Sequence, residues 1–440
     1  MMHNDGRQGL GERSTISDLK RHIHQRLLDT MDFTVARNLP HEQLYSECMR
    51  QVQGLLDSVD RPFSQNEKEQ MVREVLEEIF GLGPLEPLFR DKEVNDILVN
   101  GAEEIYVERN GVLEKTNARF RDNEQLLQVI QRIAGRVGRR IDESSPMLDA
   151  RLADGSRVNA IIPPLALDGP SVSIRQFGSA PLTVQNLLEY EALTKDMAQF
   201  LEACVHCKLN ILLSGGTGSG KTTALNILSQ WIPNEERVVT IEDSAELQLQ
   251  RDHVVRLETR PPNIEGKGEV TQRDLLRNSL RMRPDRIVIG EVRGAEVLDM
   301  LQAMNTGHEG SMTTIHANTA RDAVNRIENM VSMAGLNFPI HAIRQQIVSA
   351  IDILVQVERV TGGRRKMVTI AEITGMEGET ILMQDIFRFQ QTGVGRDGHA
   401  TGHFEVCGIR PTIADRFEWE GKPLPRDFFQ PRTLPLRAEQ

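Results

Sequence analysis

The spacing of apolar residues divides the chain into segments with different expected structures. Residues 1–14 are polar and rich in glycine, which predicts a disordered tail. Over residues 15–80 the apolar positions recur with a helical period, as at Leu19, Ile23 and Leu27, so an N-terminal helical region is expected there. This region would form a short helical bundle or a docking arm.

After residue 80 the pattern changes to short strands around one helix. Residues 96–99 and 104–107 read as strands, and the Asn100-Gly101 pair between them is typical of a tight hairpin turn. Further elements of this region are a helix over 123–137 and strands over 157–162 and 171–175. Residues 81–177 are therefore expected to form a small α+β domain, and the Gly-Ser-Ala-Pro that follows begins a linker over residues 178–185.

Strand and helix patterns alternate over residues 186–376. The expected strands lie at 209–214, 237–241, 254–257, 287–289 and 311–315, and the expected helices at 224–231, 271–281, 295–304 and 319–333. Such alternation is typical of an α/β domain with a mainly parallel sheet, in which ligands bind at the carboxyl ends of the strands. Residues 377–440 are polar and rich in Gly and Pro, with strand-like pieces at 381–389 and 404–409, which predicts a β-rich C-terminal appendage.

A glycine-rich loop between an expected strand and an expected helix provides the first candidate chemistry. Its candidate nucleotide-binding residues are Gly215, Gly216, Thr217, Gly218, Ser219, Gly220, Lys221, Thr222 and Thr223. Consecutive backbone N–H groups of such a loop, with the helix dipole behind them, bind a polyphosphate. Lys221 would reach the β- and γ-phosphates, and the hydroxyl of Thr222 would hold Mg²⁺. The chain is therefore predicted to bind a nucleoside triphosphate with Mg²⁺.

Acidic residues follow two of the later strands. Glu242, Asp243 and Glu246 come directly after the strand at 237–241, where three carboxylates would repel one another unless a cation or water lay between them. An acidic helix N-terminus would explain the same pattern without any catalytic role. Glu291 ends the apolar strand at 287–289, the usual place of the acid that binds Mg²⁺ directly or through water in a phosphate-loop site.

Two histidines flank another of these strands. His308 lies before the strand at 311–315, and His316 lies directly after it. A single histidine in such a position is more often structural. Two histidines at opposite ends of one strand that faces the site favour a role in sensing or contacting the γ-phosphate.

Composition and charge narrow the function classes. The chain has 440 residues, 39% of them hydrophobic and 26% charged, which fits two or three folded domains. A formal net charge of −11 and an aromatic content of 4% argue against a nucleic-acid-binding surface. Neither a run of about 18 apolar residues nor a signal peptide is present, so the protein is expected to be cytoplasmic and to reach a membrane only through partners.

The four cysteines do not form a recognisable disulfide or zinc pattern. Cys48, Cys204, Cys207 and Cys407 are too few and too scattered for a disulfide scaffold and fit a reducing compartment. Cys204 and Cys207 have metal-like spacing, but a structural zinc site needs a second pair of ligands. They are therefore interpreted as small side chains packed at the end of a helix.

Four separated motifs together resemble the secretion ATPase superfamily that powers type II and type IV secretion and pilus assembly. GGTGSGKTT resembles its Walker A motif, IEDSAEL its acidic Asp box, IVIGEVRG its Walker B motif and TGHEGSMTTIHA its His box. In front of them, GLGPLEPLFRDKEVNDILVNG and SPMLDARLADGSRVNAIIPPLALDGPSVSIRQF resemble the tight-adherence (Tad/Flp, CpaF-like) pilus ATPase branch. The resemblance covers about residues 70 to 375.

The resemblance implies a RecA-like P-loop ATPase domain over residues 186–376, preceded by the smaller α+β domain and the helical region. It implies a cytoplasmic homohexameric ring that hydrolyses ATP, lies peripherally at the inner membrane and drives a pilus platform protein there. Lys221 and Thr222 would hold phosphates and Mg²⁺, and Glu291 would support the metal. The other residues that it implicates are Glu246 or Glu242 for the attacking water, His308 and His316 for the γ-phosphate state, and Arg157 and Arg175, with Arg151 in reserve, for completing the site.

Other functions remain open at this point. An ATPase of a related type II/IV secretion system would carry the same motifs. A nucleic-acid motor shares the same ATPase core, although the acidic balance argues against it. A scaffold that binds nucleotide without turnover and a small-molecule kinase are further alternatives. Whether a pilus motor would extend or retract its fibre is not encoded in these motifs.

Overall fold

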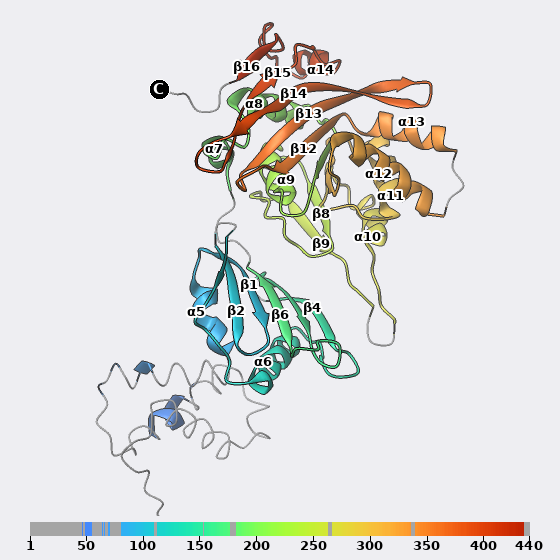
Figure 1. Cartoon of the computed structure of the whole chain (residues 1–440). Coiled ribbons are helices and arrows are strands. Elements are labelled where there is room, and N and C mark those ends of the chain that lie inside the picture. Colours follow the sequence, from blue (N-terminus) through green and yellow to red (C-terminus); the bar gives the residue numbers. More distant parts are fainter. Residues whose placement is uncertain are drawn as a thin grey trace, which may run out of the picture. The chain divides into compact units, whose positions relative to one another are not determined.

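A computed structural model describes most of the chain from residue 81 onward. The described residues are 81–109, 112–152, 154–176, 182–262, 266–335 and 339–434, together with 46, 49–54, 64, 66 and 69–70. The tail expected at 1–14 and nearly all of the helical region expected at 15–80 lie outside them. The chain divides into two compact units, Met1–Gly178 and Ser179–Gln440, which are treated separately below (Figure 1).

The first unit is built on a six-stranded antiparallel sheet with the strand order β3-β2-β1-β6-β5-β4. Its strands are β1 (Val94–Asn100), β2 (Glu104–Arg109), β3 (Val112–Lys115), β4 (Met147–Arg151), β5 (Arg157–Ile161) and β6 (Ser171–Arg175). Its helices are the 3₁₀ turn η1 (Gly83–Leu85), the short α5 (Glu86–Arg90) and α6 (Asn123–Arg136). The expected strands and the expected helix are confirmed; β3 and β4 are additional.

Local sequence explains two of these elements. Asn100 pairs with Glu104 across the β1–β2 hairpin, and Gly101 in the turn has a φ of 72°, a conformation that glycine adopts without strain. Helix α6 is capped by Asp122, whose side chain accepts a hydrogen bond from the backbone N–H of Gln125. One face of α6 is buried in the same core as the inner face of the sheet, through Leu126, Val129, Ile130 and Ile133.

The second unit contains a ten-stranded sheet with the order β16-β15-β14-β13-β12-β7-β11-β10-β8-β9. The run from β12 to β9 is parallel, and the run from β12 to β16 is antiparallel. The parallel strands are β7 (Ile211–Gly215), β8 (Val238–Glu242), β9 (Val254–Glu258), β10 (Arg286–Ile289), β11 (Met312–Ile315) and β12 (Ile353–Arg359). The antiparallel strands are β13 (Arg365–Glu377), β14 (Thr380–Val394), β15 (Ala400–Val406) and β16 (Arg432–Leu434).

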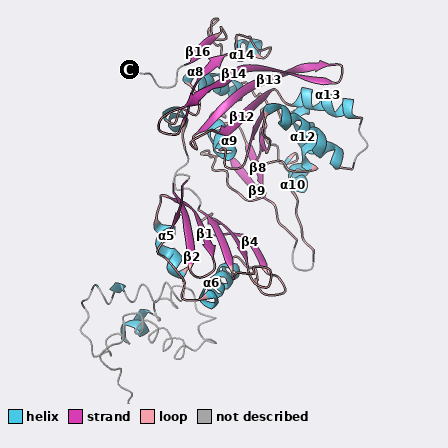
Figure 2. Cartoon of the chain, viewed as in Figure 1, coloured by secondary structure: helices cyan, strands magenta, loops and turns pink. Residues whose placement is uncertain are grey.

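Helices cover both faces of this sheet, as Figure 2 shows. The helices are α7 (Val184–Glu189), α8 (Lys195–His206), α9 (Lys221–Ser229), α10 (Gln272–Ser279), α11 (Glu296–Asn305), α12 (Ala320–Met333), α13 (Ile340–Ala350) and α14 (Ala414–Trp419). Successive residues of the central strand alternate between two cores: Ile211 and Leu213 pack with α8 and α9, and Leu212 packs with α11, α12 and α13. The predicted α/β architecture with a mainly parallel sheet is confirmed.

The C-terminal strands continue this sheet. The strand pieces expected at 381–389 and 404–409 correspond to β14 and β15, which join it through β13. Phe200 of α8 lies within 6.1 Å, between ring centroids, of the phenylalanine rings at Phe387, Phe417 and Phe429. Residues from the expected β-rich appendage at 377–440 therefore share a core with α8. Among the described residues, no helix combines the length and apolar character needed to cross a membrane.

Candidate functional site

The glycine-rich loop joins the carboxyl end of β7 to the start of α9. Gly218 and Gly220 have φ values of 69° and 99°, which is the left-handed region that glycine tolerates best. A side chain at Gly215 would overlap with the backbone oxygen of Val357 on β12. Lys221 then opens α9, so the helix N-terminus faces the space enclosed by the loop. Loop and helix have the form of a polyphosphate-binding site.

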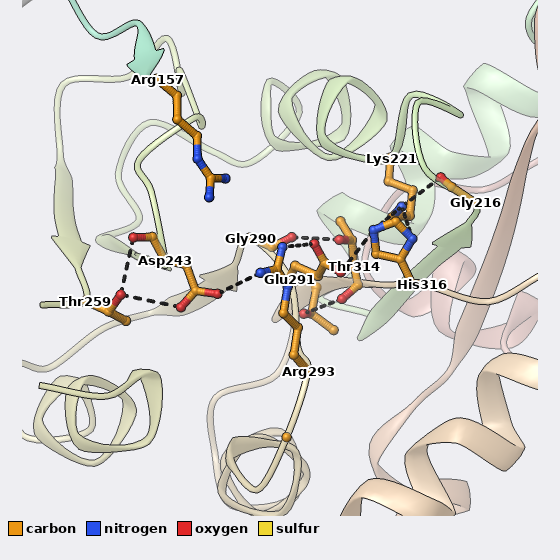
Figure 3. A network of polar contacts seen from close by, with 12 residues as sticks. Arg157, Gly216, Lys221, Asp243, Thr259, Gly290, Glu291, Arg293, Thr314 and His316 are labelled. Atoms are coloured by element: carbon orange, nitrogen blue, oxygen red, sulfur yellow. Dashed lines mark hydrogen bonds and ion pairs between the residues drawn. The ribbon is translucent and has the colours of Figure 1, made fainter. Parts of the chain in front are cut away.

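Lys221 points into this loop. Its Nζ donates to the backbone oxygen of Gly216 at 3.0 Å and lies 3.3 and 3.4 Å from the two ring nitrogens of His316 (Figure 3). The side chain is 7% exposed, and burial lowers its pKa. The lysine is therefore held near the position that a phosphate would occupy, by partners that a phosphate oxygen could replace.

A row of charged side chains continues from Lys221 along the sheet edge. Glu291 lies 3.2 Å from Nε2 of His316 and accepts a hydrogen bond from Arg293 at 2.8 Å. Arg293 also lies 3.4 Å from the carboxylate of Asp243. The hydrogen bond to Glu291 raises the pKa of Arg293, whereas burial and the charge of Lys221 lower the pKa of His316. Figure 3 shows this alternating row.

Parallel strand pairing assembles the row. β11 lies between β7 and β10, and β8 lies on the other side of β10, so all four strands end at the same edge. Thr314 on β11 binds its neighbour strand through its hydroxyl, which donates to the backbone oxygen of Gly290 at 2.7 Å. Beyond it, the backbone N–H of Val292 donates to the oxygen of Thr314 at 2.9 Å. These bonds fix the segment that carries Glu291 beside the one that carries His316.

Glu242 and Glu246 occupy different environments on the acidic loop after β8. Glu242 is 3% exposed, and one carboxylate oxygen accepts the backbone N–H groups of Glu246 and Leu247, each at 2.8 Å. Its other oxygen is buried without a partner among the described residues. Burial raises the pKa of Glu242 to about 7. Glu246 is only half-buried. Glu242 thus holds the loop in place, and the side chain of Glu246 remains accessible.

The two histidines lie at opposite ends of β11. His316 follows the strand and contacts Lys221, as described above. His308 precedes the strand, at the amino edge of the sheet, where its backbone oxygen accepts a hydrogen bond from the Ser311 hydroxyl at 2.7 Å. Its Nδ1 is buried and has no partner among the described residues. The structure therefore brings His316, but not His308, to the phosphate-binding loop.

The candidate arginines belong to the first unit. Arg157 on β5 and Arg175 on β6 are directly opposite each other in the antiparallel register. Arg157 forms an ion pair with Asp149 on β4 at 2.8 Å. Arg151 donates through Nε to the backbone oxygen of Gly155 at 3.3 Å. The three arginines are thus clustered at one end of strands β4, β5 and β6.

The loop residues fit a nucleotide with Mg²⁺. The hydroxyl of Ser219 is buried without a partner among the described residues, so a donor is available inside the loop. No group of three or more His, Cys, Asp or Glu side chains in the described part of the chain could hold a metal ion alone. Mg²⁺ in phosphate sites needs only one or two protein ligands beside phosphates and water. Thr222, which is half-buried on the first turn of α9, and Glu291 could provide these.

Cys204 and Cys207 are core residues. Both are buried at the end of α8, and burial raises the pKa of each thiol. The packing interpretation made from the sequence is confirmed for this pair. Cys48 lies outside the described residues.

Sequence reasoning missed one residue of the charged row. Arg293 contacts both Glu291 and Asp243 and thereby connects the segments after β10 and β8. It lies inside the IVIGEVRG motif, so the motif contained the signal. The interpretation of the motif considered only its acidic residue and not the cation that lies between Glu291 and Asp243.

Comparison with known proteins gives one consistent family. Residues 78–384 match the family described as "Type II/IV secretion system protein". A putative conjugal transfer protein of Mycobacterium tuberculosis is 38% identical over 307 residues, covering 68% of this chain and 87% of that protein. The type IV secretion system protein VirB11 of Bartonella quintana is 30% identical over 317 residues, covering 64% of this chain and 89% of that protein.

Among solved structures, the VirB11 ATPase from the Brucella suis type IV secretion system is 29% identical, covers 67% of this chain and 96% of that one, and has a TM-score of 0.36. The expected fold class, a RecA-like P-loop domain preceded by a smaller α+β domain, is confirmed by the family match and by the parallel sheet that carries the loop. This chain belongs to the type II/IV secretion system ATPase family.

Proposed function

We propose that this protein is a motor that hydrolyses ATP to ADP and phosphate. The observation that carries the proposal is the row Lys221–His316–Glu291–Arg293–Asp243 at the open end of the phosphate-binding loop. The cations of such a row stabilise the negative charge that develops on a transferring phosphoryl group, and its carboxylates can bind Mg²⁺ or orient water.

Each side chain has a distinct proposed role. Lys221 binds the β- and γ-phosphates, and Glu246 positions and deprotonates the attacking water. Glu242 acts on the water only through its two hydrogen bonds to the backbone that carries Glu246. Mg²⁺, when bound by Thr222 and Glu291, would neutralise charge on the phosphate oxygens.

His316 is the proposed sensor of the γ-phosphate. It lies between Lys221 and Glu291, so a phosphate that replaces His316 as the partner of Lys221 changes the contacts of His316. His308 lies at the other end of β11 and would respond through that strand. Both roles follow from the motif resemblance, and the contact with Lys221 supports the one assigned to His316.

We further propose that ATP binding closes the N-terminal domain over the catalytic domain, with Arg157 and Arg175 completing the site and Arg151 in reserve. Six such sites in a homohexameric ring would drive an inner-membrane platform protein from the cytoplasmic side. Closure requires that ATP bind the closed state more tightly than the open one, since a ligand with equal affinity for both shifts nothing. No nucleic acid is expected to take part.

The exported fibre proposed here is a Tad/Flp type IV pilus. The proposal rests on the resemblance of residues 81–101 and 145–177 to that branch. A second candidate, a conjugal or secretion ATPase, is favoured by the 38% identity to a putative conjugal transfer protein. Deletion of the gene separates them: loss of surface pili supports the first, and loss of DNA or protein transfer with normal pili supports the second.

ATP turnover is the primary test. Steady-state hydrolysis would be measured against protein concentration, with light scattering on the same samples, for wild type, Lys221→Ala and Lys195→Ala. Lys195 is an exposed lysine at the start of α8 and serves as the matched control. We expect Lys221→Ala to lower kcat/KM by about 100-fold or more, because it removes a cation that contacts the transferring group. Wild-type activity in Lys221→Ala, or strong stimulation by DNA, would contradict the proposal.

A further inference from the structure

The turn between β12 and β13 lies at the same edge of the sheet as the phosphate-binding loop. β12 is parallel to β7, with Val357 directly opposite Gly215, so the two strands end side by side. A backbone hydrogen bond from Val360 N–H to the oxygen of Arg364 (2.8 Å) closes the turn, and β13 begins at Arg365. The sheet therefore holds Arg365 beside the loop.

The side chain of Arg365 lies across two glycines of the loop. Its Nε donates a hydrogen bond to the backbone oxygen of Gly218 at 2.9 Å. A Cβ added at Gly220 would lie 3.2 Å from Cδ of Arg365, so the alkyl part of the arginine covers the residue before α9. The neighbouring Arg364 turns away and forms an ion pair with Glu191 at 3.4 Å. Within the described residues, no carboxylate pairs with Arg365.

This hydrogen bond fixes the direction of one peptide group. The oxygen of Gly218 and the N–H of Ser219 belong to the same planar peptide and point in opposite directions. The oxygen points at Arg365, and the N–H donates to the backbone oxygen of Gly216 at 3.4 Å. That same oxygen accepts from Nζ of Lys221 at 3.0 Å. The N–H of Ser219 and the amino group of Lys221 therefore converge on one oxygen, that of Gly216.

We infer that Arg365 is a positioning residue for the phosphate-binding loop. The inference rests on the proposed function only in taking the ligand of the loop to be a nucleotide. Gly218 is exposed and has a φ of 69°, so its peptide is flanked by a residue with wide conformational freedom. A guanidinium on the outer oxygen restricts that freedom and polarises the peptide, which strengthens the inner N–H as a donor. Before nucleotide arrives, the N–H is thus held toward the Gly216 oxygen that also accepts from Lys221, and a phosphate oxygen would replace this long contact of 3.4 Å.

Nucleotide affinity gives the first test. Binding of the fluorescent analogue mant-ADP to the full chain would be titrated for wild type, Arg365→Met, Arg365→Gln and Arg364→Met. Methionine keeps the stem and loses the donor, and glutamine keeps an N–H donor without charge. We expect Arg365→Met to weaken binding about fivefold, the effect of losing one exposed charge-assisted hydrogen bond. Arg365→Gln should fall between it and wild type, and the control Arg364→Met should match wild type.

Backbone exchange in the absence of nucleotide gives the second test. Amide hydrogen exchange over residues 215–222 should be faster in Arg365→Met than in wild type, since positioning precedes binding. Weaker binding with unchanged exchange would make Arg365 a direct nucleotide contact and overturn the inference. Unchanged binding and unchanged exchange would overturn it as well. If wild type does not bind mant-ADP, the proposed function fails, while the exchange comparison still tests Arg365.

Discussion

Replacing Glu242 with glutamine should make the protein more stable at alkaline pH. Its carboxylate is 3% exposed, and burial raises its pKa from 4.5 to about 7, while Arg256 opposes and Glu246 adds to this rise. Between pH 4.5 and 7 the folded protein binds more protons at Glu242 than the unfolded chain does. The free energy of unfolding of wild type therefore decreases as the pH increases through this window.

The size of the expected gain in stability follows from the difference between the folded and unfolded pKa values of Glu242. A pKa difference between 4.5 and about 7 is worth about 3 kcal/mol, since one unit equals about 1.4 kcal/mol. Glutamine removes this ionic cost and keeps an oxygen for the N–H groups of Glu246 and Leu247. Its amide NH₂ would occupy the place of the oxygen that has no partner among the described residues, which costs about 1 kcal/mol or more. The net gain at pH 8 is about 1 to 2 kcal/mol, or roughly 2 to 8 °C in Tm.

Differential scanning fluorimetry from pH 5 to pH 8 would measure the Tm difference between Glu242→Gln and wild type. The difference should grow with pH and be small or reversed at pH 5, where the wild-type carboxyl is protonated. Glu246→Gln is the control, because it removes a charge from the same loop at a half-buried position. A Tm difference for Glu242→Gln that does not change with pH would refute the reasoning.

Two further predictions concern packing and ion pairs in the second unit. Phe200→Ala should lower the free energy of unfolding by about 4 kcal/mol, because the ring is fully buried among phenylalanines of the C-terminal strands and helix. Chemical denaturation measures this free energy, and a loss below about 1 kcal/mol would show that those segments do not share a core with Phe200. Asp299→Ala should lower the free energy of unfolding by about 2 kcal/mol, since the nearly buried carboxylate accepts hydrogen bonds from Arg273 (2.6 Å) and Arg277 (2.8 Å). An unchanged Tm would mean that these contacts between α10 and α11 contribute nothing to stability.

Elements with a local signal were predictable from the sequence. The β1–β2 hairpin follows from Asn100-Gly101, and β7 with α9 follows from an apolar strand before a glycine-rich loop. The edge strand β3 was not predicted, because all of its residues are exposed and no alternation marks it. The membership of β14 and β15 in the main sheet was also not predictable, since pairing with β13 depends on contacts distant in sequence.

The candidate site shows the same division. The loop and the acid after each strand were identified from sequence because their spacing is local. The difference in burial between Glu242 and Glu246 could not be predicted from the sequence, because it depends on the space that Gly290 leaves for the Glu242 side chain. Arg365 carries no motif signal at all, and only the pairing of β12 with β7 brings it to the loop.

The charged row has an electrical consequence for the binding of anions. Lys221 and Arg293 are each within 3.4 Å of row members, and their charges are matched by Glu291 and Asp243, with an imidazole between. Matched charges create little long-range potential, so the row itself does not draw anions from solution. Arg365, which pairs with no carboxylate among the described residues, adds positive charge beside the loop. Discrimination must then come from the directed N–H groups of the loop, which suit a polyphosphate. Simple anions such as chloride should therefore compete weakly with nucleotide.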